Sequence, residues 1–310
     1  MSNGGVAVNG GEFGPDMVAG IAAVLPGEPV TLAGTPEAAG ADVLATLADS
    51  EAALVRMLTD DVRWVHVLGA GVDGFPLEVA GDRLVTCSRG ASAPAIAEFV
   101  LASMLAFEKH LPEVWLTAPP RQWNVADLGG LEGRTLGVIG LGSIGSAVAT
   151  RAQAFDMTVV GLRRRDRPSP VVGVALVRDL DELLAVADHV VIAAPATAAT
   201  AQLIDDAALS GIKPGAHLVN VARGTLVDQG ALLRALDDGR VARASLDVVD
   251  PEPLPDGHPL YAHPQVRLTP HISWSAPRTV RRTFSIFVEN VSRYRAGDPL
   301  VGTVDREEGY

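Results

Sequence analysis

Cysteine is almost absent from this sequence, in which Cys87 is the only one among 310 residues. A single thiol excludes an internal disulfide and any metal site built from several thiolates, and it fits a reducing compartment. The histidines and carboxylates are not spaced as a compact ligand set either. The sequence therefore predicts a protein without a metal site.

Long apolar runs are also absent. The nearest candidate for a membrane span, residues 95–107, carries Glu98 and is too short to cross a bilayer. Residues 1–11 have neither the basic region nor the apolar region of a signal peptide. We therefore expect a cytoplasmic protein that does not bind membranes.

Basic charge is in deficit, with 25 lysines and arginines against 37 acids and a formal net charge of −12. Nucleic-acid-binding proteins usually present a basic face, so a nucleic-acid partner is not expected. The composition, 48% hydrophobic and 20% charged, is that of an ordinary globular protein. The length is enough for about two domains.

From residue 135 onward, apolar runs alternate regularly with helical or loop segments. The expected strands are 135–139, 157–161, 173–177, 189–193, 216–221, 244–246 and 266–268. Runs this continuous are typical of a parallel sheet buried on both faces. The pattern predicts an α/β fold with a doubly wound, Rossmann-type sheet that binds its ligand at the carboxyl ends of the strands.

The rest of the chain predicts a second, smaller α/β domain. Before residue 98, short apolar runs such as RWVHVLG alternate with helical patterns such as EAALVRMLTD. A long helix is expected over 95–110. No strand is expected after the helical pattern of 276–296. We therefore expect this helix to carry the chain back to the domain formed by the residues before 98. The predicted domains are 1–98 with 276–310, and 99–275.

A glycine fingerprint, G-x-G-x-x-G, lies directly after the strand at 135–139, at Gly140, Gly142 and Gly145. The first glycine allows a tight turn, the second lets the backbone approach a pyrophosphate, and the third lets helix and strand pack closely. Free N–H groups at the helix start favour an anion. The context predicts dinucleotide binding by this turn, with Ser143 and Ile144 included; a glycine-rich turn without a ligand is the alternative.

The second strand of this unit ends on arginines. In an NAD-specific site an acid near this point binds the ribose 2′-hydroxyl. Here the position falls on Leu162 and Arg163, and Arg164 and Arg165 follow. A guanidinium can bind a 2′-phosphate that a carboxylate would repel. The sequence predicts NADP(H) as the preferred cofactor, with NAD(H) possible; simple solvation of the arginines is the alternative.

Three further segments bring ionisable groups to the ends of predicted strands. They are VNVARGTLVD with Arg223, LDVVDPEPL with Asp247 and Glu252, and LTPHISW with His271. Ketone reduction needs a proton at oxygen, which histidine donates near neutral pH, and a neighbouring carboxylate stabilises the imidazolium. A guanidinium can hold an α-keto acid. The alternatives are a surface histidine, a turn acid and an arginine paired at the sheet edge.

Over nearly its whole length the chain resembles the D-isomer-specific 2-hydroxyacid dehydrogenase family. The matching motifs are VLGAGVDGF at 67–75, APAIAEFVLASMLA at 93–106, LEGRTLGVIGLGSIG at 131–145, NVARGTLVD at 220–228, LDVVDPEPL at 246–254 and TPHIS at 269–273. The resemblance implies a Rossmann cofactor domain and a smaller, flavodoxin-like substrate domain. It also implies an NAD(P)-dependent enzyme that interconverts a small 2-keto acid and its D-2-hydroxy acid.

Within that family, a reductase of glyoxylate or hydroxypyruvate is the leading prediction. Formate dehydrogenases have a glutamine where this chain has Glu252, and the length leaves no room for the added domain of many phosphoglycerate dehydrogenases. A dinucleotide-sensing regulatory protein with little turnover, like the corepressors of the family, remains the alternative. Turnover of keto acids would separate the two.

The resemblance also assigns roles to residues. Arg223 would bind the substrate carboxylate and carbonyl, His271 would be the acid/base, and Glu252 would orient the histidine. Asp247 would meet the nicotinamide carboxamide, and backbone N–H groups of Ala70 and Gly71 would bind the substrate carboxylate, a plain turn being the alternative. The other predicted contacts are Pro195, Thr200 and Ala222 for the cofactor and Trp274 for the substrate, although packing explains Trp274 equally well.

Two expectations concern residues outside the site. His189 and His217 lie at or inside predicted strands, so they are predicted to be core residues. A homodimer is expected by resemblance, formed through the segment around 98–125 with Trp115 and Trp123.

Overall fold

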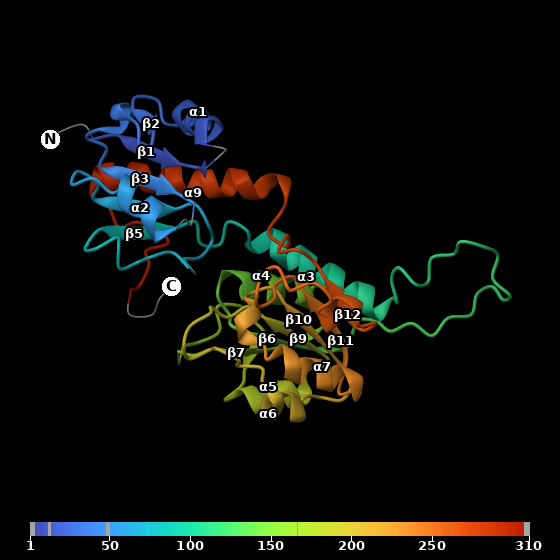
Figure 1. Cartoon of the computed structure of the whole chain (residues 1–310). Coiled ribbons are helices and arrows are strands. Elements are labelled where there is room, and N and C mark those ends of the chain that lie inside the picture. The colour runs from blue at the N-terminus through green and yellow to red at the C-terminus, as the bar shows by residue number, and fades with distance from the viewer. Residues whose placement is uncertain (1–3, 12–13, 48–49, 73, 166, 307–310) are drawn as a thin grey trace. The chain divides into compact units, whose positions relative to one another are not determined.

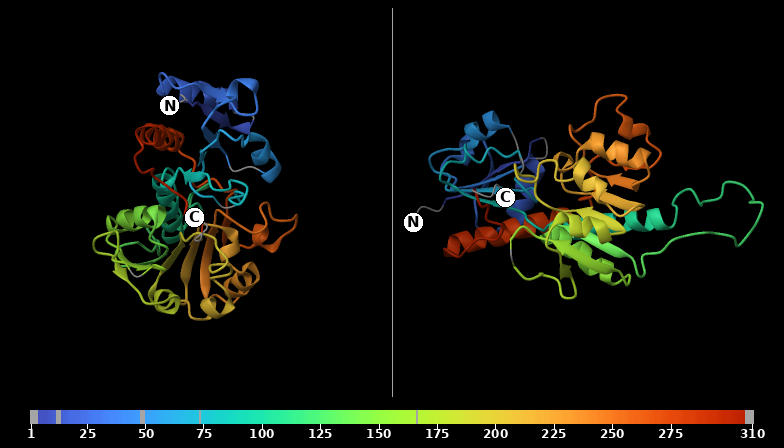
Figure 2. Two further views of the ribbon diagram at one scale, coloured as in Figure 1. Left: turned by 90° about the vertical axis from the view of Figure 1, so that its left-hand side faces the viewer. Right: turned by 90° about the horizontal axis from the view of Figure 1, so that it is seen from below.

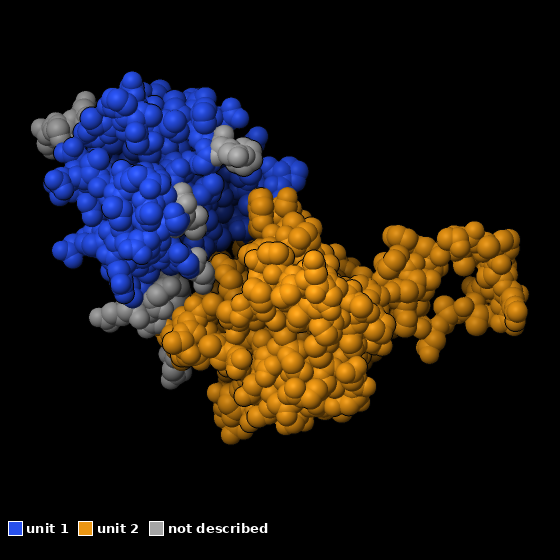
Figure 3. Space-filling view, in the orientation of Figure 1, with its two compact units in different colours: residues 1–92, 276–310 blue, residues 93–275 orange. Residues whose placement is uncertain are grey.

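The computed structural model describes residues 4–11, 14–47, 50–72, 74–165 and 167–306. The chain divides into two compact units, shown in different colours in Figure 3. Unit 1 comprises residues 1–92 and 276–310, and unit 2 comprises residues 93–275.

The first boundary between the units coincides with the start of a long helix, α3 (Ala93–Glu108). The boundary predicted at residue 98 instead falls inside this helix. All of α3 belongs to unit 2 because Ile96, Val100 and Met104 are buried in a core cluster with strands of that unit. A hydrophobic pattern marks the helix but does not show which sheet it covers.

Within the described residues, unit 2 holds a seven-stranded sheet of order β12-β11-β10-β9-β6-β7-β8, with every neighbouring pair parallel. The strands are β6 (Thr135–Ile139), β7 (Thr158–Leu162), β8 (Ala175–Leu176), β9 (His189–Ile192), β10 (Ala216–Asn220), β11 (Val241–Leu246) and β12 (Val266–Leu268). The chain winds outward from β6 through β7 to β8, then returns to β9 and winds the other way. The sheet is therefore doubly wound, with its switch point between β6 and β9.

Each strand predicted beyond residue 134 is found, with ends shifted by up to three residues. The strand predicted at 173–177 is the most reduced, to the two residues of β8. It pairs with β7 alone at the edge of the sheet, and Gly173 takes a φ of 81°, which extended chain does not have.

Helices cover both faces of this sheet (Figure 1). The helices α3 and α4 (Ser143–Gln153) pack in one core cluster, and α5 (Leu180–Val186), α6 (Asp206–Ser210) and α7 (Gln229–Asp237) pack in another. The last three begin alike, because the side chains of Asp179, Asp205 and Asp228 accept hydrogen bonds from the backbone of the first turn. Such caps satisfy N–H groups that the helix leaves unpaired.

Unit 1 contains, among its described residues, a five-stranded parallel sheet of order β2-β1-β3-β4-β5. The strands are β1 (Val6–Asn9), β2 (Val30–Leu32), β3 (Val43–Thr46), β4 (Trp64–Val67) and β5 (Leu84–Cys87), and the first two helices are α1 (Gly14–Val24) and α2 (Glu51–Met57). This strand order is the one found in flavodoxin-like folds.

The last helix, α9 (Pro277–Ala296), packs on the sheet of unit 1 (Figure 1). Phe287 and Val291 are buried in a cluster with Val6 and Trp64 from the strands. At the end of the helix, Arg295 donates to Glu28 and Asp42. The C-terminal segment is therefore part of the same core as the N-terminal sheet.

None of the described helices is long and apolar enough to cross a membrane. The same part of the chain contains no group of three or more histidines, cysteines and acids placed to hold a metal ion.

A histidine lies inside the sheet of unit 1. His66, in β4, is completely buried, with its ring centroid 5.0 Å from that of Phe287. Its Nδ1 lies 2.7 Å from Thr86 Oγ1, and its Nε2 lies 3.0 Å from Ser88 Oγ. Both ring nitrogens are thus satisfied by hydroxyl groups, and burial lowers the pKa of His66 to about 3.

This depressed pKa predicts a loss of stability in mild acid. The unfolded chain binds a proton near pH 6.5, whereas the folded chain does not do so until about pH 3, so stability is complete above pH 6.5 and falls below it. At about pH 5.5 the loss from His66 alone should be about 1.4 kcal/mol.

Urea unfolding at about pH 7.5 and about pH 5.5 measures this loss, and His66→Gln should reduce the pH difference by about that amount. Burial also lowers the pKa of His217, so the variant should retain that part of the dependence. An unchanged pH difference in His66→Gln would contradict the assignment.

Candidate active site

The predicted ionisable residues collect at the carboxyl edge of the sheet in unit 2. Arg223, Asp247 and His271 follow β10, β11 and β12, which are adjacent parallel strands. The segments after β11 and β12 touch directly, because the backbone N–H of His271 donates to the Asp247 carbonyl at 2.9 Å. One edge of the sheet therefore carries all three segments, as the sequence pattern indicated.

Glu252 and His271 form a hydrogen-bonded pair, with Oε2 of the acid 2.9 Å from Nδ1 of the histidine. The other oxygen of Glu252 accepts from the backbone N–H of Val249 at 3.2 Å, which fixes the carboxylate. Because an ionised carboxylate only accepts, Nδ1 carries the proton and Nε2 is the atom that exchanges one with a substrate. His271 also has a φ of 54°, an uncommon conformation that tends to occur at functional sites.

Asp247 has a role that the sequence did not reveal. It is 1% exposed, and its carboxylate accepts hydrogen bonds from Thr269 Oγ1 at 2.7 Å and from the backbone N–H groups of Ile272 and Ser273 at 2.9 Å. The acid thereby holds the turn on which His271 stands. A carboxylate has about four acceptor sites, so these three bonds leave room for the predicted nicotinamide contact, which stays a prediction.

The turn that carries Arg223 is held by Asn220, which sequence reasoning also missed. Asn220 is buried, its Nδ2 donates to the Arg223 carbonyl at 2.9 Å, and its Oδ1 accepts from the N–H of Ala222 at 3.0 Å. Next in sequence, a Cβ on Gly224 would lie 1.9 Å from the carbonyl carbon of Val249. The backbone after β10 therefore packs directly against the backbone that leads to Glu252.

Trp274 lies beside the histidine. Its indole N–H donates to the His271 carbonyl at 2.9 Å, and the side chain is half-exposed. The tryptophan thus contributes to holding this turn, and its predicted contact with substrate stays a prediction.

The glycine turn has the geometry that a dinucleotide pyrophosphate needs. Gly140 has a φ of 96°, and a Cβ on it would lie 2.8 Å from the backbone of Ala194. A Cβ on Gly145 would lie 1.9 Å from the Gly140 carbonyl oxygen. Gly142 caps α4 and has open space where a Cβ would be, and Ser143 and Ile144 begin the helix. The chain can therefore receive an anion at the start of α4.

The arginine segment adjoins this turn. The backbone N–H of Gly140 donates to the Leu162 carbonyl at 3.0 Å, so Arg163 begins beside the glycines. The Arg163 guanidinium donates to the Pro168 carbonyl, and Arg164 and Arg165 follow in the same loop.

The remaining predicted cofactor residues lie at the same edge of the sheet. After β9, Thr200 Oγ1 donates to the Pro195 carbonyl at 2.7 Å, which closes a turn. After β10, Ala222 is buried beside Asn220. Ala70 and Gly71 belong to unit 1, where they follow β4 at the carboxyl edge of that sheet.

The prediction that His189 and His217 are core residues is confirmed, since both are completely buried. Their Nδ1 atoms lie 3.2 Å apart, and the outer nitrogens bind Glu108 at 3.0 Å and Ser245 at 2.9 Å. Glu108 could not be predicted as their partner, because it lies at the end of an apolar helix far away along the chain.

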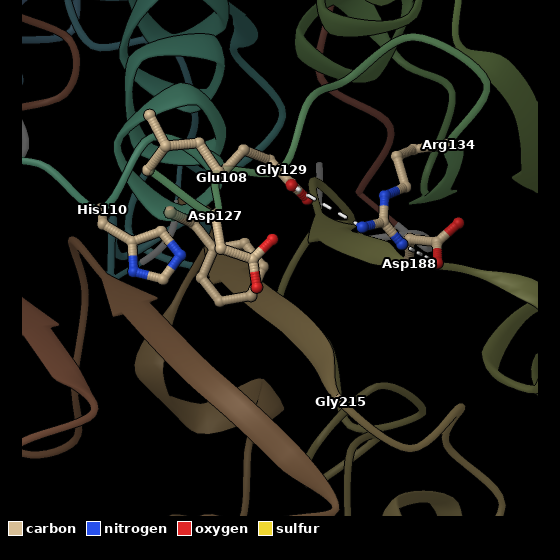
Figure 4. Close-up of a pocket in the computed structure, with 9 residues that line it drawn as sticks. Glu108, His110, Asp127, Gly129, Arg134, Asp188 and Gly215 are labelled. Atoms are coloured by element: carbon tan, nitrogen blue, oxygen red, sulfur yellow. Dashed lines mark hydrogen bonds and ion pairs between the residues drawn. The ribbon is translucent and has the colours of Figure 1, made fainter. Parts of the chain in front are cut away.

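A pocket of about 470 Å³ lies at the opposite, amino edge of this sheet (Figure 4). Arg134 and Asp188, which directly precede β6 and β9, line it together with Glu108. The Arg134 guanidinium lies 3.8 Å from Glu108 and 3.3 Å from Asp188. Doubly wound sheets bind their ligands at the carboxyl edge, so this pocket is not the candidate active site.

Comparison with known proteins gives a consistent result. Residues 101–273 match the family model of the D-isomer specific 2-hydroxyacid dehydrogenase NAD binding domain. A glyoxylate reductase from Thermofilum pendens is 33% identical over 86% of this chain and 81% of its own length. The chain spans about half the length of the curated D-3-phosphoglycerate dehydrogenases that it also matches.

Two solved structures share the fold over nearly the whole chain. A D-isomer specific 2-hydroxyacid dehydrogenase from Xanthobacter autotrophicus Py2, in complex with NADPH and MES, has a TM-score of 0.83 and 30% identity and covers 99% of both chains. An NADPH-dependent glyoxylate/hydroxypyruvate reductase from Sinorhizobium meliloti, in complex with NADP and sulfate, has a TM-score of 0.84 and 25% identity, covering 99% of this chain and 100% of its own.

Proposed function

Because the chain belongs to the D-isomer-specific 2-hydroxyacid dehydrogenase family, we propose that it reduces a small 2-keto acid to the D-2-hydroxy acid with NADPH. The observation that carries this proposal is the Glu252–His271 pair at the edge of the sheet that also bears the glycine turn. Glyoxylate and hydroxypyruvate are the substrates we favour, because relatives of similar length are named for them.

The reaction divides between the cofactor and the chain's own residues. When bound, the reduced nicotinamide supplies the hydride that adds to the keto carbon. His271 donates a proton from Nε2 to the carbonyl oxygen, and Glu252 stabilises the imidazolium through Nδ1 until the proton leaves. Arg223 holds the substrate carboxylate and carbonyl with its planar donor fork. Asp247 contributes by holding the turn of His271.

A panel of small 2-keto acids assayed with NADPH and with NADH tests the proposal. We expect fast oxidation of NADPH with glyoxylate or hydroxypyruvate. Tight NADPH binding without turnover of any keto acid would instead support the dinucleotide-sensing alternative.

The preference for NADPH is proposed from the arginine segment beside the glycine turn. Replacing Arg163, Arg164 and Arg165 together by serine should lower kcat/KM for NADPH by about 10- to 100-fold, because charge-assisted hydrogen bonds to the 2′-phosphate are lost. The kcat/KM for NADH should change little. The control is Arg178→Ser, which removes an exposed arginine after β8 that pairs with Glu182. A wild-type protein that favours NADH would contradict the assignment.

We also propose that the protein is a homodimer joined through the segment that follows α3. Residues 109–130 form neither helix nor strand and extend away from the body of unit 2 (Figure 2). Trp115 is 70% exposed and Trp123 is 75% exposed, and apolar surface of this kind is expected to be covered.

Sedimentation velocity tests the dimer. The wild-type chain should sediment as a dimer at micromolar concentration, and replacing Trp115 and Trp123 by serine should shift it toward the monomer. The matched control is Val172→Ser, which removes an apolar side chain that is 94% exposed elsewhere in unit 2. A wild-type monomer, or a double variant as dimeric as the wild type, would contradict the proposal.

A further inference from the structure

The turn after β4 in unit 1 has two peptide groups with a common orientation. The Gly69 carbonyl accepts a hydrogen bond from the backbone N–H of Ser88 at 2.9 Å, and the Ala70 carbonyl accepts one from the thiol of Cys87 at 3.6 Å. Both carbonyls therefore point toward the end of β5. In a trans peptide the C=O of one residue and the N–H of the next point in opposite directions.

The N–H groups of Ala70 and Gly71 consequently both point away from β5. Neither donates a hydrogen bond to any described residue, and both residues are partly exposed. Two successive N–H groups that point to the same side can form a binding place for an anion. The N–H groups of Ala70 and Gly71, which are predicted to bind the substrate carboxylate, thus owe their direction to the hydrogen bonds that residues 87 and 88 donate to the preceding carbonyls.

A chain of hydrogen bonds, three of them buried, fixes Ser88 and the end of β5. Trp64 can only donate, so Thr86 Oγ1 accepts from its indole N–H at 2.8 Å and gives its own proton to His66 Nδ1. His66 Nε2 then donates to Ser88 Oγ, and the Ser88 hydroxyl donates to the Thr283 carbonyl in α9. These directions follow because the Thr283 carbonyl can only accept, which makes Ser88 its donor, and because burial lowers the pKa of His66, so that its neutral ring carries one N–H. The end of β5 is thereby tied to β4 and to α9.

We infer that Cys87 and Ser88 are positioning residues, which orient the peptide groups of residues 69–71 so that their N–H groups bind the substrate carboxylate. This inference rests on the proposed function for the identity of the anion. Cys87 acts through the Ala70 carbonyl and therefore on the N–H of Gly71. Ser88 acts through its backbone N–H on the Gly69 carbonyl, and its side chain keeps that backbone in place.

Variants of Cys87 give the sharpest test. Cys87→Ala removes the donor to Ala70, and it should raise KM for glyoxylate and weaken binding of oxalate to the NADPH-loaded protein by about 5-fold each, the effect of one net hydrogen bond. The kcat and the affinity for NADPH should stay within about 2-fold of wild type. Cys87→Ser keeps a donor in the same place and should restore both KM and oxalate affinity. Ser88→Ala should change the same two quantities in the same direction as Cys87→Ala.

The matched control is Val85→Ala, two residues earlier on β5 and on the same face of the strand. Val85 is buried but has no polar group, so its truncation should lower the stability to urea without changing KM or oxalate affinity. An unchanged oxalate affinity in Cys87→Ala, an equal loss in Val85→Ala, or a wild-type protein that does not bind oxalate would each overturn the inference. Oxalate titration by calorimetry needs no turnover, so a wild-type protein that binds oxalate but reduces no keto acid would refute the proposed function alone.

Discussion

Replacing His271 by asparagine should lower kcat for keto-acid reduction by about 10²- to 10⁴-fold, the usual contribution of a general acid or base. Asparagine can still donate a hydrogen bond to Glu252, but it has no group that delivers a proton at the position of Nε2. The turn should persist, because Asp247 holds it through Thr269 and the backbone of residues 272 and 273. Affinity for NADPH should therefore stay within a few-fold of wild type.

Two further variants make this result specific. Glu252→Gln should also lower kcat, but by a smaller factor than His271→Asn. The histidine remains in this variant, while the charge that stabilises its imidazolium form is lost. His263→Asn is the control, since it removes another histidine of unit 2, whose ring pairs with an exposed acid, Asp237, and accepts from the backbone N–H of Gln265. Stopped-flow reduction with saturating NADPH measures the step, and near wild-type activity in His271→Asn would rule out this residue as the proton donor.

Loss of the Arg223 side chain should be nearly as damaging. Arg223→Gln should lower kcat/KM by about 10²- to 10³-fold, as does the loss of a donor that stabilises charge on a developing oxyanion. Arg223→Lys should recover little of this, because a lysine ammonium cannot make the paired, planar contacts of a guanidinium. The fold should tolerate both changes, because Asn220 holds the backbone of this turn through two hydrogen bonds, to which the Arg223 guanidinium adds one, to the Ala222 carbonyl at 2.6 Å.

Steady-state kinetics with glyoxylate and a urea unfolding curve for each variant separate chemistry from stability. Arg234→Gln serves as the control, because it removes an exposed arginine of α7 that pairs with Asp206. Equal kinetic effects of Arg223→Gln and Arg234→Gln, or full recovery in Arg223→Lys, would contradict the proposed contact.

Much of this architecture could be predicted from periodicity alone. Strands buried on both faces, such as β9 and β10, read as unbroken apolar runs and were located to within a residue or two. Prediction was weakest where context decides. The edge strand β8 is shorter than its pattern suggests, and α3 is assigned to unit 2 by contacts that no local pattern contains.

The candidate catalytic residues could likewise be predicted from local sequence, whereas the residues that hold them in place could not. Arg223, Glu252 and His271 could be predicted because each stands in a segment that follows a strand, and the pairing of Glu252 with His271 is found as expected. The residues that hold them were missed. Asp247 was predicted as a cofactor contact, which stays a prediction, and its hydrogen bonds to the turn of His271 were not foreseen. Asn220 was predicted only as the end of a strand. Such bracing depends on distances between separate turns, which a sequence does not display.

The contact between Gly224 and the main chain at Val249 has a consequence for how this site can change. The backbone at Gly224 already touches the backbone at Val249, and this contact sets the distance between Arg223 and the Glu252–His271 pair. A bulkier residue at 224 would therefore increase that distance. Adaptation to larger substrates should therefore leave the contact between Gly224 and Val249 unchanged and alter other residues that surround the substrate. Selection experiments for longer keto acids should accordingly recover glycine at 224 in every active variant.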